Sequence, residues 1–187
     1  QVSEETNYYN YNLIDALSTE EGDMIPIGLG STLPFYDGEH CLINDTIFLF
    51  EGAHKPCEKH TKKDIVDTAF MYLHAPYLWG GRTPMGIDCS GLTQMAYRLN
   101  GRAIPRDASQ QIKLGATLSF IEEAEPGDLA FFDDDEGNIV HVGLILEDNQ
   151  ILHASGKVRI DSIDQQGIFN KELGEHTHKL RLIKQVF

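Results

Sequence analysis

The sequence predicts an α+β domain over residues 62–187, preceded by a small all-β unit over residues 1–58. Two observations lead to this fold class. Between residues 62 and 114 apolar side chains recur at helical spacing, and from residue 128 onward they follow the alternation of strands. Helices first and antiparallel strands afterwards are typical of an α+β domain. With 187 residues, the chain is long enough for one large or two small domains.

The first unit is predicted from short apolar runs separated by turn residues. The runs cover residues 24–29, 32–36, 40–43 and 46–50. Asp37-Gly38 and Asn44-Asp45 are predicted to form hairpin turns between them. Such a short unit is marginal as an independent core, so we expect it to pack on the second region or on a missing upstream piece. Three early aromatic residues are interpreted as edge-strand aromatics, with a sugar or peptide platform as the alternative: Tyr8, Tyr9 and Tyr11.

A polar segment joins the two regions. Its spacing His54-x-x-Cys57-x-x-His60, with Cys41 as a fourth ligand, suggests zinc. The segment lacks the second closely spaced ligand pair of structural zinc sites, so we interpret it as a linker and predict no metal. If Cys89 must remain a thiolate, only Cys41 and Cys57 could form a disulfide, and the sequence leaves that pairing open.

Three helices are predicted next. Thr61 to Asp64 resembles a capping pattern, and an apolar face follows it up to Pro76. A second helix has Cys89 in its first turn and ends near Gly101, and a shorter one covers residues 108–114. Strands are then predicted over residues 129–132, 139–146, 150–155, 158–163 and 178–184. The acidic run 133–136 is interpreted as a solvated turn, with calcium as a weak alternative.

Cys89 is the first candidate for chemistry. Leu92, Met95, Ala96 and Leu99 follow it at helical spacing, so its thiol lies at the positive end of a helix dipole. This position favours the thiolate and therefore predicts a nucleophile. The alternative is a small buried core residue, because free cysteine is among the most buried residue types.

Two histidines on neighbouring strands favour the nucleophile. If the loop 147–149 has three residues with Asn149 in the left-handed conformation, His153 lies opposite Gly143. His141 then becomes its diagonal neighbour on the same face, at roughly 7–8 Å between backbones. We therefore expect His141 to act as the base for Cys89 and His153 to orient His141.

The charge balance excludes one class of partner. A net charge of −14 argues against nucleic acid, whose binding needs a basic surface, and against long-range attraction of an acidic polymer. Local exceptions are Arg82, Arg106, Lys157 and Arg159. No stretch of eighteen apolar residues occurs, so no membrane span is expected.

Six short blocks carry a family resemblance. They are Tyr77-x-Trp79-Gly80-Gly81, Asp88-Cys89-Ser90-Gly91, Arg106-Asp107-x-Ser109-Gln110, Pro126-Gly127-Asp128-Leu129, His141-Val-Gly and His153-Ala-Ser. In this order, over about residues 62–187, they resemble the NlpC/P60 family of papain-like cysteine peptidases. The resemblance implies a papain-like fold and hydrolysis of bacterial cell-wall stem peptides, commonly between γ-D-glutamate and the diamino acid, as in enzymes of the dipeptidyl-peptidase VI type.

The resemblance also implies residue roles. Cys89 would be the nucleophile, His141 the base and His153 the orienting residue, and Tyr77 would assist at the oxyanion. Asp88 and Ser90 would hold the substrate amine, and Arg106 is a candidate for the glutamate carboxylate. Further substrate-binding candidates are Trp79, Asp107 and Ser109. No cofactor is expected. Small SH3-like modules often precede this domain, so the first unit could be one.

Other interpretations stay open at this point. The same triad could serve an amidase or acyltransferase, and the domain could be a cell-wall-binding module with a vestigial site. The chain begins with Gln1 rather than Met, so we expect an upstream segment to have been removed or omitted. The bacterial compartment, cytoplasm or periplasm and cell envelope, therefore stays open.

Overall fold

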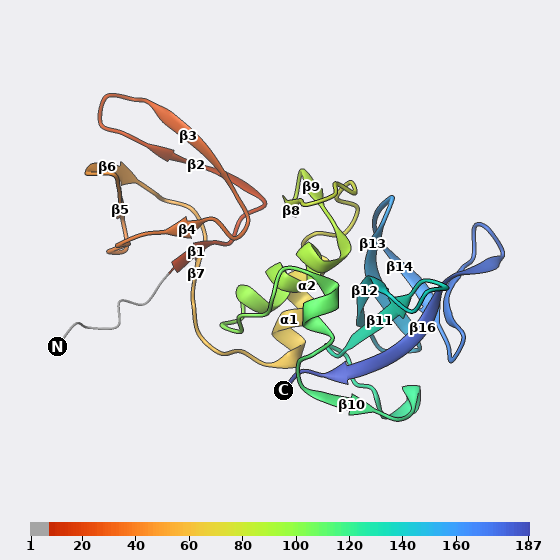
Figure 1. The fold of residues 1–187 in the computed structure, drawn as a ribbon. Coiled ribbons are helices and arrows are strands. Elements are labelled where there is room, and N and C mark those ends of the chain that lie inside the picture. The colour runs from red at the N-terminus through yellow and green to blue at the C-terminus, as the bar shows by residue number, and fades with distance from the viewer. Residues whose placement is uncertain (1–7) are drawn as a thin grey trace. The chain divides into compact units, whose positions relative to one another are not determined.

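The computed structural model describes residues 8–187, and the first seven residues of the predicted β unit lie outside this range. The chain divides into two compact units, Gln1–Lys59 and His60–Phe187 (Figure 1). Within the described residues, none of the helices is both long enough and apolar enough to cross a lipid bilayer.

Between residues 8 and 59, the first unit forms two small antiparallel sheets. Their strand orders are β4-β1-β7 and β3-β2-β6-β5. The strands are β1 (Tyr8–Asn10), β2 (Ile14–Ser18), β3 (Met24–Gly28), β4 (Thr32–Leu33), β5 (His40–Ile43), β6 (Thr46–Leu49) and β7 (His54–Pro56). Asn44 and Asp45 both have positive φ and close the β5–β6 hairpin, the geometry that Asn and Asp tolerate best. A buried cluster fills the unit: Leu17, Leu33, Cys41, Phe48 and Phe50.

One predicted turn in this unit needs correction. The Asp37-Gly38 turn does not join paired strands, because β4 belongs to one sheet and β5 to the other. The Asp37 side chain instead accepts hydrogen bonds from the backbone of Glu39 and His40 and so forms a local turn. The open disulfide question also has an answer, since Cys41 is buried, Cys57 is exposed and both are free.

The early tyrosines differ in their surroundings. Tyr9 is buried, and Tyr8 stacks edge-on against Tyr36 and His54 with ring centroids 5.5 and 5.6 Å apart. The Lys55 ammonium lies over the Tyr11 ring. The edge-strand interpretation is wrong, because β1 is the central strand of its sheet and Tyr11 follows its end. Contacts within the unit instead account for the three aromatic side chains as packing residues.

The second unit begins with its helices. They are α1 (Lys62–Phe70), α2 (Cys89–Arg98), α3 (Ala108–Gln111) and the short 3₁₀ turn η1 (Ile121–Glu123). Thr61 and Asp64 form the predicted capping box on α1. The predicted face of α2 is buried throughout, and α2 packs on α1 and on the sheet (Figure 1). The third helix is shorter than expected and ends at Gln111.

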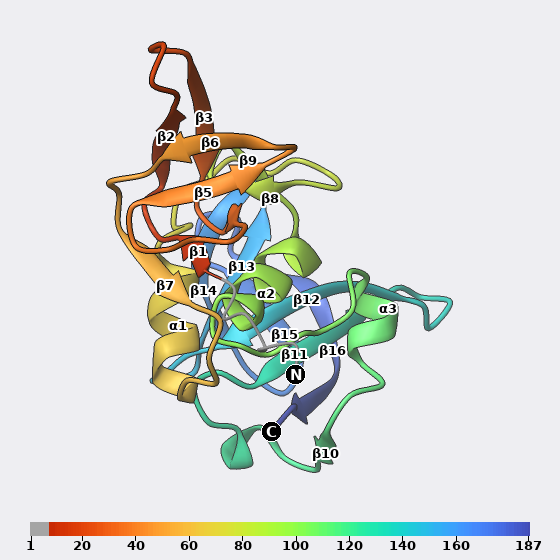
Figure 2. The same cartoon turned by 90° about the vertical axis from the view of Figure 1, so that its left-hand side faces the viewer.

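The sheet of this unit closes on itself. Its order is β10-β16-β11-β12-β13-β14-β15, and β15 also pairs with β16, so six strands form a ring (Figure 2). The strands are β10 (Ala116–Leu118), β11 (Leu129–Asp133), β12 (Ile139–Ile145), β13 (Gln150–Ser155), β14 (Lys157–Ile163), β15 (Gly167–Asn170) and β16 (Glu175–Gln185); β8 (Arg82–Thr83) and β9 (Gly86–Ile87) form a separate hairpin. Five of these strands match the predicted ones within a few residues. Four short strands, β8, β9, β10 and β15, were not expected, because they are too brief to show a period of two.

Candidate active site

The N-terminus of α2 positions Cys89. Asp88 is the N-cap, and its side chain accepts the backbone N–H of Gly91 at 2.7 Å. Cys89 is 7% exposed, and its thiol accepts a hydrogen bond from the backbone N–H of Val142, the neighbour of His141 on β12. The nucleophile candidate and the histidine-bearing strand are therefore adjacent.

Burial changes the expected protonation of this thiol. The sequence interpretation has the helix terminus favouring a thiolate, but burial raises the pKa of the Cys89 thiol above its usual value, and the Asp88 charge adds to this. Hydrogen bonds from backbone amides oppose the rise without cancelling it. The thiolate expectation is therefore wrong for the resting site, and this thiol needs a base to give up its proton.

The two histidines lie as the hairpin register predicts. Gly143 is opposite His153, and both Asp148 and Asn149 have positive φ in the loop. His141 Nε2 and His153 Nδ1 are 2.9 Å apart, and both side chains are buried. A Cβ at Gly143 would stand 2.6 Å from Ile151 Cδ1 and 3.0 Å from the Cβ of His153, so glycine leaves the room that His153 occupies.

Asp161 continues the hydrogen-bonded series. Its Oδ2 lies 2.9 Å from His153 Nε2, and Arg159 Nε lies 2.7 Å from the same oxygen. Sequence reasoning missed Asp161 and noted Arg159 only as an isolated positive charge. A signal was present: Arg159 pairs with His153 across β13 and β14, and a residue two positions along a strand shares its face.

His178 on β16 completes a group of three imidazoles. Burial lowers the pKa of His141 well below its usual value, and the neighbouring His178 and His153 lower it further. Burial likewise lowers the pKa of His178 to about 4. Both rings are therefore neutral near pH 7, and His141 is in the form that can accept a proton.

The same three histidines are where the site could hold a metal. Their ligand atoms lie within 4.8 Å of one another, and among residues 8–187 no other set of three histidine, cysteine or carboxylate side chains is grouped in this way. The His54–Cys57–His60 segment therefore does not form a metal-binding group. Two of these nitrogen atoms already face each other in a hydrogen bond, which a metal would have to break. In the acidic run, the Asp134 carboxylate accepts hydrogen bonds from the backbone of Glu136 and Asn138 and closes the turn.

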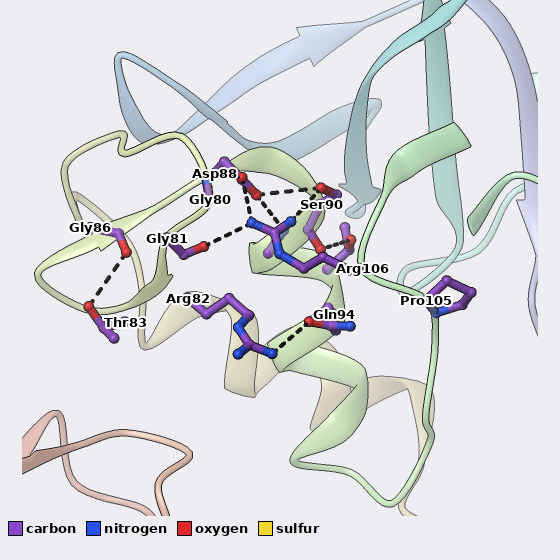
Figure 3. A network of polar contacts seen from close by, with 12 residues as sticks. Gly80, Gly81, Arg82, Thr83, Gly86, Asp88, Ser90, Gln94, Pro105 and Arg106 are labelled. Carbon is purple, nitrogen blue, oxygen red and sulfur yellow. Dashed lines mark hydrogen bonds and ion pairs between the residues drawn. The ribbon is translucent and has the colours of Figure 1, made fainter. Parts of the chain in front are cut away.

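Asp88, Ser90 and Arg106 form a second network beside the thiol (Figure 3). Arg106 Nη2 lies 2.6 Å from Asp88 Oδ2, and Arg106 Nη1 donates to Ser90 Oγ at 2.8 Å. The backbone N–H of Gly80 also donates to Asp88 Oδ2 at 2.7 Å. Burial opposes ionisation of Asp88, but these bonds outweigh it and lower the pKa of the carboxyl. The site therefore contains a fixed negative charge whose two oxygens are both engaged.

A pocket of about 610 Å³ opens over this network. Seven predicted site residues line it: Trp79, Asp88, Cys89, Ser90, Arg106, Asp107 and Ser109. Trp79 is 83% exposed. Asp107 is the N-cap residue of α3, but its side chain makes no capping hydrogen bond. Tyr77, His141 and His153 are not among the lining residues. Tyr77 is half-buried, and burial raises the pKa of its hydroxyl, with the negative charge of the nearby Asp88 adding to the rise.

A thiol at the start of a helix, packed on a sheet that carries a buried histidine pair, is the arrangement of a cysteine peptidase. The sequence profile of the NlpC/P60 family matches residues 74–177, more than half of the chain, and the chain belongs to this family.

Two curated relatives are similar in sequence. The chain is 40% identical over 121 residues to the gamma-D-glutamyl-L-lysine dipeptidyl-peptidase of Bacillus subtilis (strain 168), covering 62% of this chain and 40% of that protein. It is 41% identical over 118 residues to dipeptidyl-peptidase 6 of Lysinibacillus sphaericus, covering 61% of this chain and 41% of that protein. The chain thus spans about two fifths of the length of these relatives.

One solved structure is similar in fold over nearly the whole chain. It is an NlpC/P60 family protein from Bacillus cereus ATCC 10987, with a TM-score of 0.79 and 22% identity, covering 97% of this chain and 63% of that one. At this identity the likeness concerns the fold.

Proposed function

We propose that the chain hydrolyses bacterial cell-wall stem peptides at the bond between γ-D-glutamate and the diamino acid, and releases L-Ala-γ-D-Glu. The observation that carries the proposal is the buried His141–His153 pair, whose His141 lies on β12, the strand that contacts the Cys89 thiol through the backbone of Val142. The Bacillus subtilis relative is named gamma-D-glutamyl-L-lysine dipeptidyl-peptidase, which supports the choice of bond.

The proposed reaction begins with a protonated thiol and a neutral imidazole. As Cys89 Sγ attacks the scissile carbonyl carbon, its proton passes to His141 Nδ1, a C–S bond forms and the carbonyl electron pair moves onto oxygen. His141 then returns the proton to the departing amine of the diamino acid, and the C–N bond breaks. Water, deprotonated by His141, attacks the carbonyl carbon of the resulting thioester. The C–S bond breaks, the dipeptide leaves, and His141 returns the proton to the Cys89 sulfur.

The developing oxyanion needs hydrogen-bond donors. The backbone N–H of Cys89 is one of the first amides of α2, which have no partner within the helix. Together with the Tyr77 hydroxyl it is our proposed oxyanion site. Loss of one donor of this kind costs roughly 2.7–4 kcal/mol of transition-state stabilisation.

We assign substrate binding to the pocket over α2. The free amine of L-Ala would contact Asp88 Oδ1 and Ser90, whose mutual bond is long at 3.4 Å and is the one most easily exchanged. The glutamate carboxylate was assigned to Arg106, but both terminal nitrogens of this guanidinium already bind Asp88 and Ser90. We therefore propose that Arg106 chiefly fixes Asp88, with Nε left for the substrate. Trp79, Asp107 and Ser109 would form the outer wall.

The test is product analysis on a defined panel of stem peptides that differ in the diamino acid. Mass spectrometry should find L-Ala-γ-D-Glu and the peptide that begins with the diamino acid, and Cys89→Ala should produce neither. Transfer of the acyl group to an added amine in place of water would favour an acyltransferase. Binding of the peptides without turnover by the native chain would favour a wall-binding module.

We also propose that the first unit is an SH3-like module.

A further inference from the structure

We propose that Asp161, held by Arg159, is a positioning residue that fixes the tautomers of both active-site histidines and so leaves His141 Nδ1 free to act as the base. The inference rests on the proposed function in one respect, that His141 is the base for Cys89. The placement of the protons does not depend on which peptide is cut.

The Asp161 carboxyl group is buried and ionised. Its side chain is 5% exposed, and Arg159 binds both of its oxygens, Nε to Oδ2 at 2.7 Å and Nη2 to Oδ1 at 2.9 Å. Burial opposes ionisation, but the bonds from His153 and Arg159 prevail and lower the pKa of the carboxyl. Asp161 is therefore a carboxylate, which can only accept hydrogen bonds.

The Asp161 carboxylate determines which nitrogen carries the hydrogen on His153 and, through His153, on His141. Because Asp161 only accepts, His153 Nε2 must carry the hydrogen across the 2.9 Å contact. A neutral His153 then has a lone pair on Nδ1. That nitrogen lies 2.9 Å from His141 Nε2, so His141 must donate from Nε2. The neutral His141 is left with its lone pair on Nδ1, the nitrogen that the proposed reaction requires.

The opposite arrangement of these hydrogens is disfavoured. With the hydrogen on His153 Nδ1, its Nε2 lone pair would face the Asp161 carboxylate at 2.9 Å, and His141 would carry its hydrogen on Nδ1. His141 could then accept nothing from Cys89. Without Asp161, His153 would lose the acceptor that holds its hydrogen on Nε2, and neither tautomer would be favoured to the same degree.

Arg159 has a supporting role that follows from the sheet. It stands opposite His153 in the β13–β14 register, and Asp161 lies two residues further on the same strand. Its outer nitrogen also reaches the exposed Glu172 at 3.3 Å. Arg159 therefore offsets the buried charge of Asp161 and aims Oδ2 at His153.

The test compares three variants in the full chain. Asp161→Ala removes the acceptor, and the double variant Asp161→Leu with Arg159→Met removes both charges, so that no unpaired buried charge can unfold the site. The matched control is Asp164→Asn, because Asp164 binds His176 at the same 2.9 Å distance but has no link to Cys89.

The first measurement is the ¹⁵N spectrum of the histidines, assigned with His141→Ala and His153→Asn. We expect the Nε2–H tautomer for both His141 and His153 in the native chain and in Asp164→Asn, and a mixture or the Nδ1–H tautomer in both Asp161 variants. A native His153 with its hydrogen on Nδ1 would overturn the proposal, as would unchanged tautomers in both variants.

The second measurement is turnover of the stem peptide. We expect kcat to fall at least about 10-fold in both Asp161 variants, less than the roughly 10⁴-fold loss seen when a carboxylate that directly orients a catalytic histidine is removed, with KM changed less than about 2-fold. Loss through KM alone, or unchanged kcat in both variants, contradicts the proposal. If the native chain cleaves no stem peptide, the proposed function fails, and the spectra still decide the role of Asp161.

Discussion

The imidazole of His178 lies over that of His141, with ring centroids 4.2 Å apart and planes tilted by 30°. This contact joins β16 to β12, two strands that are not neighbours in the sheet order. A protonated His178 would place a positive charge against the proposed base, and burial of both rings prevents that near neutral pH.

The pH dependence of turnover follows from this burial. His141 accepts a proton only when it is neutral, and its pKa is lowered well below 6.5 by burial. We therefore expect the acid limb of the kcat profile to lie below pH 6.5, so that activity persists in mildly acidic buffer. A kcat profile measured from pH 4 to 8 checks this, and an acid limb centred above pH 6.5 would contradict it.

The lowered pKa of His178 makes the stability of the fold depend on pH. His178 has a folded pKa of about 4 against 6.5 for the ordinary group, so between these values the unfolded chain binds more protons. The free energy of unfolding should therefore be fully developed above pH 6.5 and fall as the pH drops toward 4. His178→Phe keeps a ring over His141 and should flatten this slope in urea titrations. An unchanged slope in that variant would assign the dependence to other groups.

Loss of the nucleophile should abolish turnover. Cys89→Ser and Cys89→Ala should each reduce kcat at least about 10³-fold, because the hydroxyl is far less acidic than the thiol and the methyl group cannot attack at all. Thermal unfolding should stay close to native. Turnover retained in Cys89→Ala would refute the mechanism.

Labelling offers an independent view of the thiol. Cys57 is exposed and would react first with iodoacetamide, so the experiment needs a Cys57→Ser background. There Cys89 should be labelled in preference to the buried Cys41, and His141→Ala should slow the reaction because the thiol has lost its base. Equal rates with and without His141 would contradict the assigned pairing.

The two histidines should differ in how much they matter. His141→Ala should be nearly as damaging as loss of Cys89, whereas His153→Asn should retain measurable turnover, since an amide can still hold one hydrogen bond to His141. The order of the two effects is the measurement of interest. A larger loss in His153→Asn would mean that the roles are exchanged.

Recognition of a free amine can be tested with a capped substrate. We expect L-Ala-γ-D-Glu-diaminopimelate to be cleaved and its N-acetylated form to be cleaved poorly, because acetylation removes the charge that Asp88 would bind. Asp88→Asn keeps an acceptor for the Gly91 backbone and should narrow the difference between the two substrates. Merely structural damage would lower both rates together, and equal cleavage by the native chain would refute amine recognition while leaving the cysteine chemistry intact.

The parts of the site that depend on local pairing were accessible from the sequence. The β12–β13 register follows from a loop of three residues, so the face shared by His141 and His153 could be predicted. Cys89 was placed by the helical spacing behind it. Asp161 required the pairing of β13 with β14 as well, a second register that the sequence interpretation did not work out.

Neither the position of His178 beside His141 nor the raised pKa of the Cys89 thiol could be predicted from local sequence patterns. β16 returns from the end of the chain to lie beside β11, and no local pattern predicts that distant pairing. The protonation of Cys89 depends on how completely the folded chain covers it, since burial raises the pKa of the thiol despite the hydrogen bonds from backbone amides. Both properties arise from tertiary packing.

The ring of six strands has a consequence for how the site keeps its shape. β12 and β13 each have a hydrogen-bonded neighbour on both sides, and the β15–β16 pairing leaves the ring without a loose end next to them. Detaching β12 or β13 from the sheet therefore requires breaking two ladders at once, so the backbone amides of these strands should exchange with deuterium more slowly than those of β10, which pairs with β16 alone among the described strands. The proton-transfer machinery would thus be set when the chain folds, before any substrate arrives.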